Sequence, residues 1–388
     1  MGKRTSLWIL EKIHVFQTRL DVFVDGDGNE SVMKWVPPFR ACRALTSTAA
    51  VATPSGTIGD WFHPEQIQSG WVNGTDYEIV TMGGYWVDMY LCSSPLAASN
   101  SIGQTCNGTD QNRKCYVSQP GVSPMVSQTI AHFRQYLKAR FNYGGFAGAP
   151  AGSQWAGKGG LIPYALWFEL WIWTRINRWL LRGNTNGYNA SDHIPQWHLD
   201  PNDIGVLDGY QPSSYGASVT GGGSPLWEIP ISDFCGNRWE FTDGLRLYNG
   251  GIYTAGKTVN PFTNPTDGYG HSCFTDTGLS ISGVTSGQSI ASYRTEASIK
   301  QHGIPASSTT TAGQGGFDGQ GWWHEASDER VALRGGGCGN GAQCPGALNF
   351  YNASSNYNWN IGARAAQGFW QKLERHCLPR QSKKLYRL

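Results

Sequence analysis

Apolar residues recur at helical spacing in two parts of the chain, and this periodicity predicts two helices. The first helix is expected to start with Ser123 as its N-cap and Pro124 at its first position, and to end near Phe141. The second is expected from about Pro163 to Leu181, with Gly183 as its C-cap. Because the second segment carries tryptophans on more than one face, we expect it to be buried on most sides.

Elsewhere apolar positions alternate over short runs bounded by glycine, which predicts strands. Residues 77–91 alternate around Gly83-Gly84, where a bulge or bend is expected. Further short strands are expected within residues 227–253 and 278–284. Two helices combined with short strands and long Gly-rich loops predict an α+β fold.

The last part of the folded chain, residues 329–366, sets a polar segment between two regular ends. It opens with the alternating Val331 and Leu333, passes Gly335-Gly336-Gly337, and closes on Trp359-Asn360-Ile361-Gly362-Ala363-Arg364. Between them, residues 349–360 read NFYNASSNYNWN, a composition close to that of antibody loops. Tyr and Trp give large contact area with few torsions to freeze, while Ser and Asn offer adaptable hydrogen bonds. This pattern predicts a ligand-binding loop; the alternative is a simple Gly/Asn-rich turn.

Composition supports a loop-rich fold and argues against several function classes. The 388 residues include 51 Gly, 17 Trp, 17 Tyr and 15 Phe, with only 15% charged residues. The formal net charge of +2 supplies no global attraction to nucleic acid, so nucleic acid is not an expected partner. The nine Cys residues show no repeated CxxC pattern, which gives a zinc site little support. Cys106 and Cys115 could pair, with Cys92 near them, if the compartment is oxidising.

Neither a signal peptide nor a membrane span is expected, so the sequence predicts a soluble product. The apolar run Leu7–Leu10 is interrupted by charged residues before a signal sequence is complete. The richest apolar run, 161–181, contains Glu169, Arg175 and Arg178. The tail at 367–388 is basic, which suits an acidic surface or, more simply, a solvated end.

Four short motifs superficially suggest ligand or catalytic sites, and a structural role is favoured for each. Residues 25–30 lack the length of a calcium loop and predict a hairpin turn. Residues 152–159 lack the hydroxyl residue that a phosphate-binding loop needs. His193 and His198 have no third metal ligand that the sequence places near them. Residues 323–325 (Trp-His-Glu) have no nucleophile motif beside them, so a packed, hydrogen-bonded His324 is expected.

Three motifs, in this order along the chain, carry a resemblance to a known family. They are Gly84-Tyr85-Trp86-Val87-Asp88-Met89-Tyr90; Gly236-Asn237-Arg238-Trp239-Glu240-Phe241 followed by Asp243-Gly244-Leu245; and Arg334-Gly-Gly-Gly with the Asn/Ser/Tyr segment and Asn360-Ile361-Gly362-Ala363-Arg364. The set resembles the variable proteins of diversity-generating retroelements, which use a C-type lectin fold of the formylglycine-generating (sulfatase-modifying) type. The resemblance covers roughly residues 75–366.

The resemblance implies a domain plan and a fold. It implies an N-terminal arm and attachment region at 1–74, and a C-type lectin-like domain at 75–366, with two helices packed on short antiparallel strands. Within that domain the variable region would be 335–360, and 367–388 would be a basic C-terminal tail that departs from the family pattern. No cofactor is expected, although Asn237 and Glu240 could help to hold calcium, as in relatives.

The resemblance also implies a function, that of a non-enzymatic, hypervariable receptor-binding protein. Relatives act as tips of phage tail fibres or as cell-surface binders, so a virion location is expected, with a host or bacterial cell surface as the alternative. The partners would be a host-cell receptor, protein or glycan, and other virion proteins through the N-terminal region. Some relatives form trimers, although the sequence shows no heptad that requires this.

By match to the family's variable region, a set of residues is expected to face the ligand. In the family, Asn codons are mutated at adenines, and the products include the residue types found here. The expected ligand-facing residues are Cys338, Asn340, Gln343, Cys344, Asn349, Tyr351, Asn352, Ser354, Ser355, Asn356, Tyr357 and Asn358.

A second function remains open on the same resemblance. Formylglycine-generating oxidases bind copper through two Cys residues in the terminal region, where this chain has Cys338 and Cys344. Two thiolates would suit Cu(I). The spacing is wider than expected for those enzymes, and no perturbed acid or base is recognised beside the pair. A binding protein is therefore the favoured reading.

Overall fold

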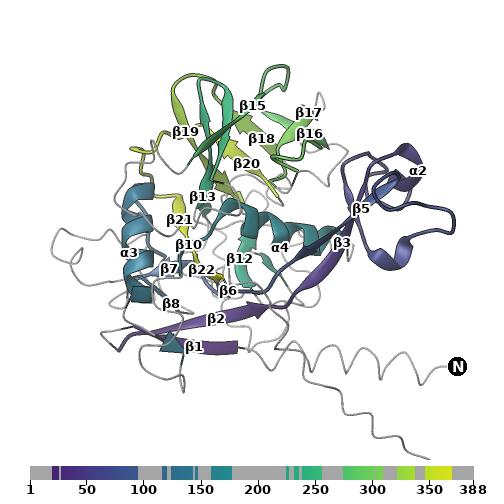
Figure 1. Cartoon of the computed structure of the whole chain (residues 1–388). Coiled ribbons are helices and arrows are strands. Elements are labelled where there is room, and N and C mark those ends of the chain that lie inside the picture. The colour runs from purple at the N-terminus through teal and green to yellow at the C-terminus, as the bar shows by residue number, and fades with distance from the viewer. Residues whose placement is uncertain are drawn as a thin grey trace, which may run out of the picture.

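The computed structural model describes residues 20–25, 28–94, 116–119, 124–142, 145–146, 159–176, 224–226, 231–235, 238–255, 274–300, 302–308, 321–336 and 346–368. These residues are mostly β-structure with few helices (Figure 1). Within these ranges no helix combines the length and the apolar character that crossing a membrane requires.

One sheet of six strands joins the two ends of the described chain. Its order is β10-β22-β6-β2-β1-β9, and each neighbouring pair is antiparallel. Its strands are β1 (Leu20–Val24), β2 (Glu30–Val36), β6 (Tyr85–Asp88), β9 (Gly145–Phe146), β10 (Gly159–Leu161) and β22 (Ala365–Gly368). Strands on both sides of residue 74 therefore share one sheet, while the division of the chain into 1–74, 75–366 and 367–388 stays a prediction.

Asp25 and Asn29 are hydrogen-bonded across the connection between β1 and β2, in agreement with the turn predicted for residues 25–30. The Asp25 carboxylate accepts a hydrogen bond from the main-chain N–H of Asn29 at 2.9 Å. Gly28 has a φ of 84°, a value that favours glycine. The acidic side chain here serves the hairpin.

The second large sheet has nine strands and centres on β13 (Trp239–Tyr248). β13 pairs antiparallel with β14 and β19 and parallel with β21. A second parallel pair joins β18 and β20. The other strands of this sheet are β14 (Gly251–Thr254), β15 (Thr275–Ser280), β16 (Gln288–Tyr293), β17 (Pro305–Ser308), β18 (Gly321–His324), β19 (Glu329–Arg334), β20 (Leu348–Phe350) and β21 (Ile361–Ala363).

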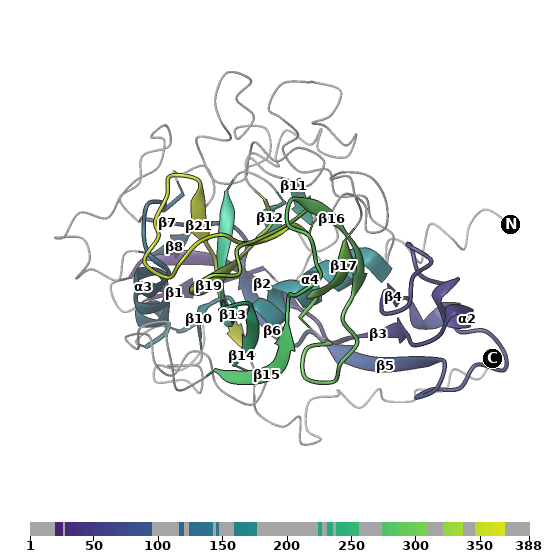
Figure 2. The ribbon, with the colours of Figure 1, turned by 90° about the horizontal axis from the view of Figure 1, so that it is seen from above.

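A small lobe projects from the body of the molecule (Figures 1 and 2). Its sheet has the order β4-β3-β5 and its own cluster of buried side chains, which includes Cys42, Phe62 and Tyr77. The lobe consists of β3 (Phe39–Ala44), α2 (Ser47–Ala50), β4 (Trp61–Phe62), the 3-10 helix η1 (Pro64–Gln66) and β5 (Tyr77–Met82). The remaining short strands are β7 (Cys92–Ser93), β8 (Val117–Ser118), β11 (Ser224–Leu226) and β12 (Ile231–Cys235).

The first predicted helix exists, but its start was wrongly placed. Helix α3 spans Ile130–Asn142, so its end near Phe141 is confirmed. Pro124 instead forms an isolated bridge with Ser93, which holds it in extended conformation before the helix. Ser127 has a φ of 56°, a left-handed conformation that separates this bridge from the helix. The helical spacing of the apolar residues thus extended beyond the helix.

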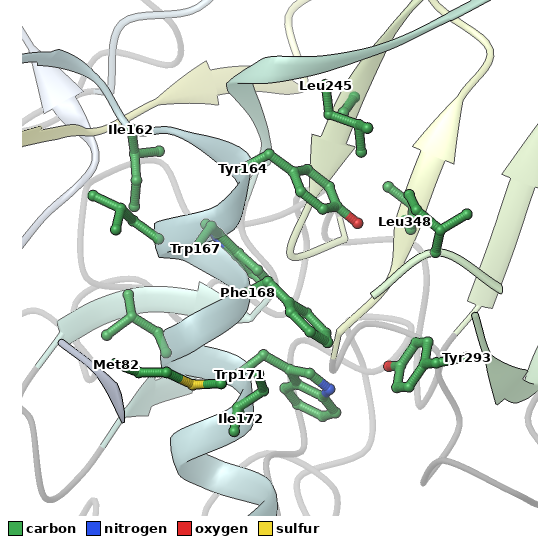
Figure 3. Close-up of a cluster of buried hydrophobic side chains, with 14 of the residues drawn as sticks. Met82, Ile162, Tyr164, Trp167, Phe168, Trp171, Ile172, Leu245, Tyr293 and Leu348 are labelled. Carbon is green, nitrogen blue, oxygen red and sulfur yellow. The ribbon is translucent and has the colours of Figure 1, made fainter. Parts of the chain in front are cut away.

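Helix α4 spans Tyr164–Ile176 and starts directly after Pro163, as predicted. It is buried on most sides, which confirms the reading of its tryptophans. Trp167, Phe168 and Trp171 point into a cluster that also contains Leu245, Tyr293 and Leu348 from the nine-stranded sheet (Figure 3). Residues 177–183, including the predicted C-cap, lie outside the described residues.

The predicted strand at 77–91 is two strands, β5 and β6, with the expected bend between them. Gly83 and Gly84 have φ values of 78° and 83°. A Cβ at Gly83 would lie 2.2 Å from the carbonyl oxygen of Pro37, so only glycine fits this bend.

The strand expected at 278–284 is confirmed only to Ser280, where β15 ends.

Candidate functional site

The polar segment predicted to bind a ligand is a loop, residues 351–360, between β20 and β21. β20 is held on both sides, by β18 and β19, and β21 pairs with β13. Phe350 and Ile361, which flank the loop, are buried at 0% and 2% exposure. In Figure 2 this yellow segment leads into β21 beside α3. Both ends of the loop are therefore fixed in the nine-stranded sheet.

Main-chain hydrogen bonds from three separate elements hold this loop. The N–H groups of Val331, Ser127 and Trp239 donate to the carbonyl oxygens of Asn352, Asn358 and Asn360, at 2.8, 2.9 and 2.9 Å. Each acceptor is a backbone oxygen that every amino acid possesses. The loop's position is therefore held by groups that do not depend on which side chains it carries.

Several predicted residues of the loop expose their side chains. Tyr351 is 45% exposed and Tyr357 is 66% exposed. Ser355, Asn356 and Asn358 are also exposed. The Tyr351 hydroxyl lies 3.2 Å from the Ser286 hydroxyl, which joins the loop to the turn before β16. These five side chains are placed where a ligand could reach them, and ligand contact remains a prediction.

Three other predicted residues hold the loop's own shape. The Asn349 side-chain oxygen accepts from the main-chain N–H of Tyr351 at 2.7 Å. The Asn352 side-chain oxygen accepts from the Asn356 amide group at 3.3 Å. The Ser354 hydroxyl donates to the Glu329 carboxylate at 2.7 Å. These three side chains are half-buried. Their hydrogen bonds shape the loop, so their effect on a ligand would be indirect.

The remaining predicted residues, Cys338, Asn340, Gln343 and Cys344, lie outside the described residues. The described residues on either side of this segment are tied together by Arg334. Its guanidinium donates to the Gly346 carbonyl at 2.6 Å and to the Tyr164 hydroxyl. It also lies over the rings of Trp167 and Phe168, at 5.2 and 5.6 Å from their centroids. A fully buried cation thus links β19, helix α4 and Gly346.

Two buried ion pairs join the chain that follows the loop to the rest of the molecule. Arg364 donates to both carboxylate oxygens of Glu240 at 2.7 Å, and Arg140 donates to Asp88 at 2.7 Å. Arg364 also donates to the Asp88 carbonyl at 3.2 Å, which joins the two pairs. Burial raises the pKa of the Asp88 carboxyl, while Arg140 acts in the opposite sense. These charges fasten α3, β6 and β13 to the chain that follows the loop.

Glu240, which the resemblance made a possible calcium ligand, is paired with an arginine of the chain itself. Both Glu240 oxygens bind Arg364, and Asn237 lies outside the described residues. Over the ranges that the structure describes, His, Cys, Asp and Glu side chains form no group of three suited to a metal ion. Trp239 fills part of the core, since it is 5% exposed within a buried cluster.

The Trp-His-Glu motif at 323–325 is structural, as predicted. Nε2 of His324 lies 2.7 Å from the Val284 carbonyl oxygen, and its ring packs on Trp322 with centroids 5.1 Å apart. His193 and His198, and the loop at 152–158, lie outside the described residues.

Two residues at the loop were missed by sequence reasoning. Trp359 was grouped with the closing residues 359–364 and left out of the expected ligand-facing set, yet it precedes β21 and is 44% exposed. Glu329 was treated only as the start of a strand, yet it anchors Ser354. The aromatic-rich composition of residues 349–360 contained the signal for Trp359, whereas nothing in the sequence marked Glu329.

Comparisons with known proteins give distant likenesses only. No protein-family model and no curated protein matches the chain. Among solved structures, the chain is similar to PvdO from Pseudomonas aeruginosa, at 15% identity over 90% of this chain and 98% of that one, with a TM-score of 0.33. It is also similar to the P3c and U1 variants of Major Tropism Determinant, each at 12% identity over 90% of this chain and 71% of theirs, with TM-scores of 0.27. TM-scores this low do not establish a shared fold.

Proposed function

We propose that this chain is a ligand-binding protein whose loop 351–360 presents exchangeable contacts on a fixed scaffold. One observation carries the proposal: the loop exposes a run of side chains while backbone groups hold its position. Asn352 and Asn358 are held through their carbonyl oxygens, so substitution of their side chains leaves these bonds available. Substitution of exposed side chains such as those of Ser355 and Tyr357 typically changes the free energy of unfolding by within about 0.5 kcal/mol.

The exposed side chains suit recognition of a macromolecular surface. Tyr351 and Tyr357 offer aromatic area with few torsions to freeze, while Ser355, Asn356 and Asn358 offer adaptable hydrogen bonds. Residues 349–360 contain no Asp, Glu, Lys or Arg, which matches the depletion of charge at interface centres. We propose that the ligand is a cell-surface receptor, protein or glycan.

The sequence resemblance supports a more specific form of this function. We propose a C-type lectin-like domain of the formylglycine-generating type, diversified by a retroelement and used for attachment by a phage tail or another virion structure. The N-terminal region would then bind other virion proteins. On this proposal the chain is not an enzyme, and Cys338 and Cys344 belong to the variable surface.

Sequencing the DNA that flanks the gene tests diversification directly. We expect a near-copy of the segment encoding residues 335–366 beside a reverse transcriptase gene, with differences confined to template adenines. The codons that differ should include those of Tyr351, Ser355, Asn356, Tyr357 and Asn358. Absence of any such copy would remove the genetic part of the proposal and leave the binding part to be tested alone.

Selection from a display library tests binding without knowledge of the receptor. The five positions just named are randomised in the full chain, and the library is selected against lysozyme as an arbitrary folded protein. A matched library randomises five exposed positions on the lobe: Ser47, Thr48, Val51, Ile58 and Val72. We expect specific binders from the loop library at a frequency at least ten-fold above the lobe library. Equal frequencies would contradict a dedicated binding loop.

A further inference from the structure

Trp359 combines exposure with a fixed position, and no predicted role accounts for it. Its side chain is 44% exposed, so a large part of the indole is open to solvent. On its protein side, the guanidinium carbon of Arg238 lies over the ring, 5.4 Å from its centroid. Arg238 itself is 1% exposed. A buried cation therefore supports an exposed aromatic ring, an arrangement that stabilises the ring where it stands.

The main chain around Trp359 is fixed on both sides. The carbonyl of Asn358 accepts from the N–H of Ser127 at 2.9 Å, and the carbonyl of Asn360 accepts from the N–H of Trp239 at 2.9 Å. Trp239 directly follows Arg238 in the chain, so the same segment holds the backbone and supports the ring. Neither carbonyl bond requires a particular side chain at position 358 or 360.

Gly362 of β21 lies next to the Cβ of Arg238. A Cβ at Gly362 would lie 3.7 Å from the Cβ of Arg238 and 3.4 Å from the carbonyl oxygen of Met125. Gly362 pairs with Glu240 in the parallel β13–β21 register. The backbone next to Arg238 is thus held by strand pairing in the scaffold, at Trp239 and Glu240.

Pre-organisation gives such a ring a large effect on binding. Tryptophan is enriched among the few residues that dominate interface energetics. A side chain that is already fixed loses little conformational freedom when a ligand covers it, so more of its contact energy appears as affinity. Tyr351 and Tyr357 lie in the same loop and are also exposed.

We propose that Trp359 is a constant anchor of the binding surface, contacting ligand whichever side chains surround it, and that Arg238 is the residue that positions it. This inference rests on the proposed function. If the template also reads TGG at this position, it contains no adenine there, and mutation confined to template adenines would leave residue 359 unchanged while its neighbours vary. Affinity would then have a fixed contribution from Trp359 and an exchangeable one from the neighbouring positions.

Substitution within selected binders tests the anchor. Binders to lysozyme are taken from the loop library described above, in which Trp359 is retained, and Trp359→Ala is introduced into each. We expect Kd to rise at least ten-fold in most of them, and Trp359→Phe to give a smaller rise. Val72→Ala, an exposed apolar truncation on the lobe at a residue 55% exposed, is the matched control and should leave Kd unchanged. Thermal unfolding of each variant confirms that the chain stays folded.

The outcomes separate the anchor from the proposed function. If most binders keep Kd within two-fold on Trp359→Ala, the anchor is wrong while the binding loop stands. If neither this library nor one built on Trp359→Ala yields specific binders at a higher frequency than the lobe library, the proposed binding function itself is contradicted.

A double-mutant cycle tests the role of Arg238, because a merely structural role would not depend on Trp359. We expect Arg238→Met to raise Kd when residue 359 is Trp and to have little effect on Kd when it is Ala. Equal effects of Arg238→Met in the two backgrounds would show that Arg238 does not act through the ring.

Discussion

Arg364 and Glu240 form a fully buried ion pair with two hydrogen bonds, each 2.7 Å long. Glu240 lies on β13, and Arg364 follows β21, the strand into which the loop 351–360 runs. The pair therefore fastens the C-terminal end of the loop to the centre of the nine-stranded sheet. Residues 351–360 contain no charged side chain, whereas Arg364, shortly after the loop, belongs to this buried ion pair.

Removing one member of this pair should destabilise the protein strongly. Glu240→Ala would leave the Arg364 guanidinium buried without its carboxylate, and such losses typically cost about 3–5 kcal/mol. Denaturant unfolding measures the change. The matched control is Glu325→Gln. The Glu325 side chain is 50% exposed and pairs with Arg330, so we expect its substitution to lower the free energy of unfolding by about 1 kcal/mol or less. Equal losses in the two variants would contradict the fastening role of the buried pair.

Exposed loop positions should tolerate substitution, and the glycine at the base of the neighbouring segment should not. We expect Ser355→Ala and Tyr357→Ser each to change the free energy of unfolding by within about 0.5 kcal/mol. Gly335 has a φ of +83°, and a Cβ there would lie 3.0 Å from the Phe234 carbonyl oxygen. Gly335→Ala should therefore cost about 1–2 kcal/mol. Thermal unfolding of the three variants measures these changes, and a loop variant as costly as Gly335→Ala would contradict the scaffold proposal.

The two neighbouring serines of the loop should behave differently. Ser354→Ala removes the hydrogen bond to Glu329, for which we expect a loss of about 1.5–3 kcal/mol because the acceptor is charged. Ser355→Ala removes an exposed hydroxyl and serves as the control. Hydrogen exchange at the N–H of Val331, which donates to Asn352 in the same loop, should quicken only in the Ser354 variant. Identical exchange in both variants would show that Ser354 does not shape the loop.

Sequence patterns predicted the elements that depend on local chemistry. Pro163 marked the start of α4, and Gly83-Gly84 marked the bend between β5 and β6, because proline and glycine restrict the backbone wherever they occur. The start of α3 was missed because the bridge between Pro124 and Ser93 is a tertiary contact that overrides helical periodicity.

The candidate site shows the same division between local and long-range information. The composition of residues 349–360 indicated an exposed polar loop, whereas the support of Trp359 by Arg238 joins residues 121 positions apart and has no local signature. The Arg364–Glu240 pair joins residues 124 positions apart and was likewise not foreseen. Contacts of this range depend on how β13 and β21 pair, which the sequence alone did not show.

The burial of Lys34 predicts that the free energy of unfolding rises with pH in the alkaline range. It lies on β2 between β1 and β6, with 0% of its surface exposed, and burial lowers its pKa to about 8. In the unfolded chain a lysine pKa is about 10.4. Below about pH 8 the ammonium is charged in both states, and its burial penalises the folded state. As the pH rises from about 8 towards 10, the folded state releases its proton first, so the free energy of unfolding should rise.

Other groups change stability in the same pH range, so the measurement has to isolate Lys34. Burial raises the pKa of Cys42 to about 11, and the unfolded thiol ionises first above about pH 8.5, which lowers stability as the pH rises. Comparing the native chain with Lys34→Met, both of which retain Cys42, removes this contribution. Between about pH 8 and 9.5 we expect the native chain to gain roughly 1 kcal/mol relative to Lys34→Met. Parallel curves for the two proteins would mean that Lys34 keeps an ordinary pKa, and a relative loss would mean that its ammonium is stabilised in the folded state.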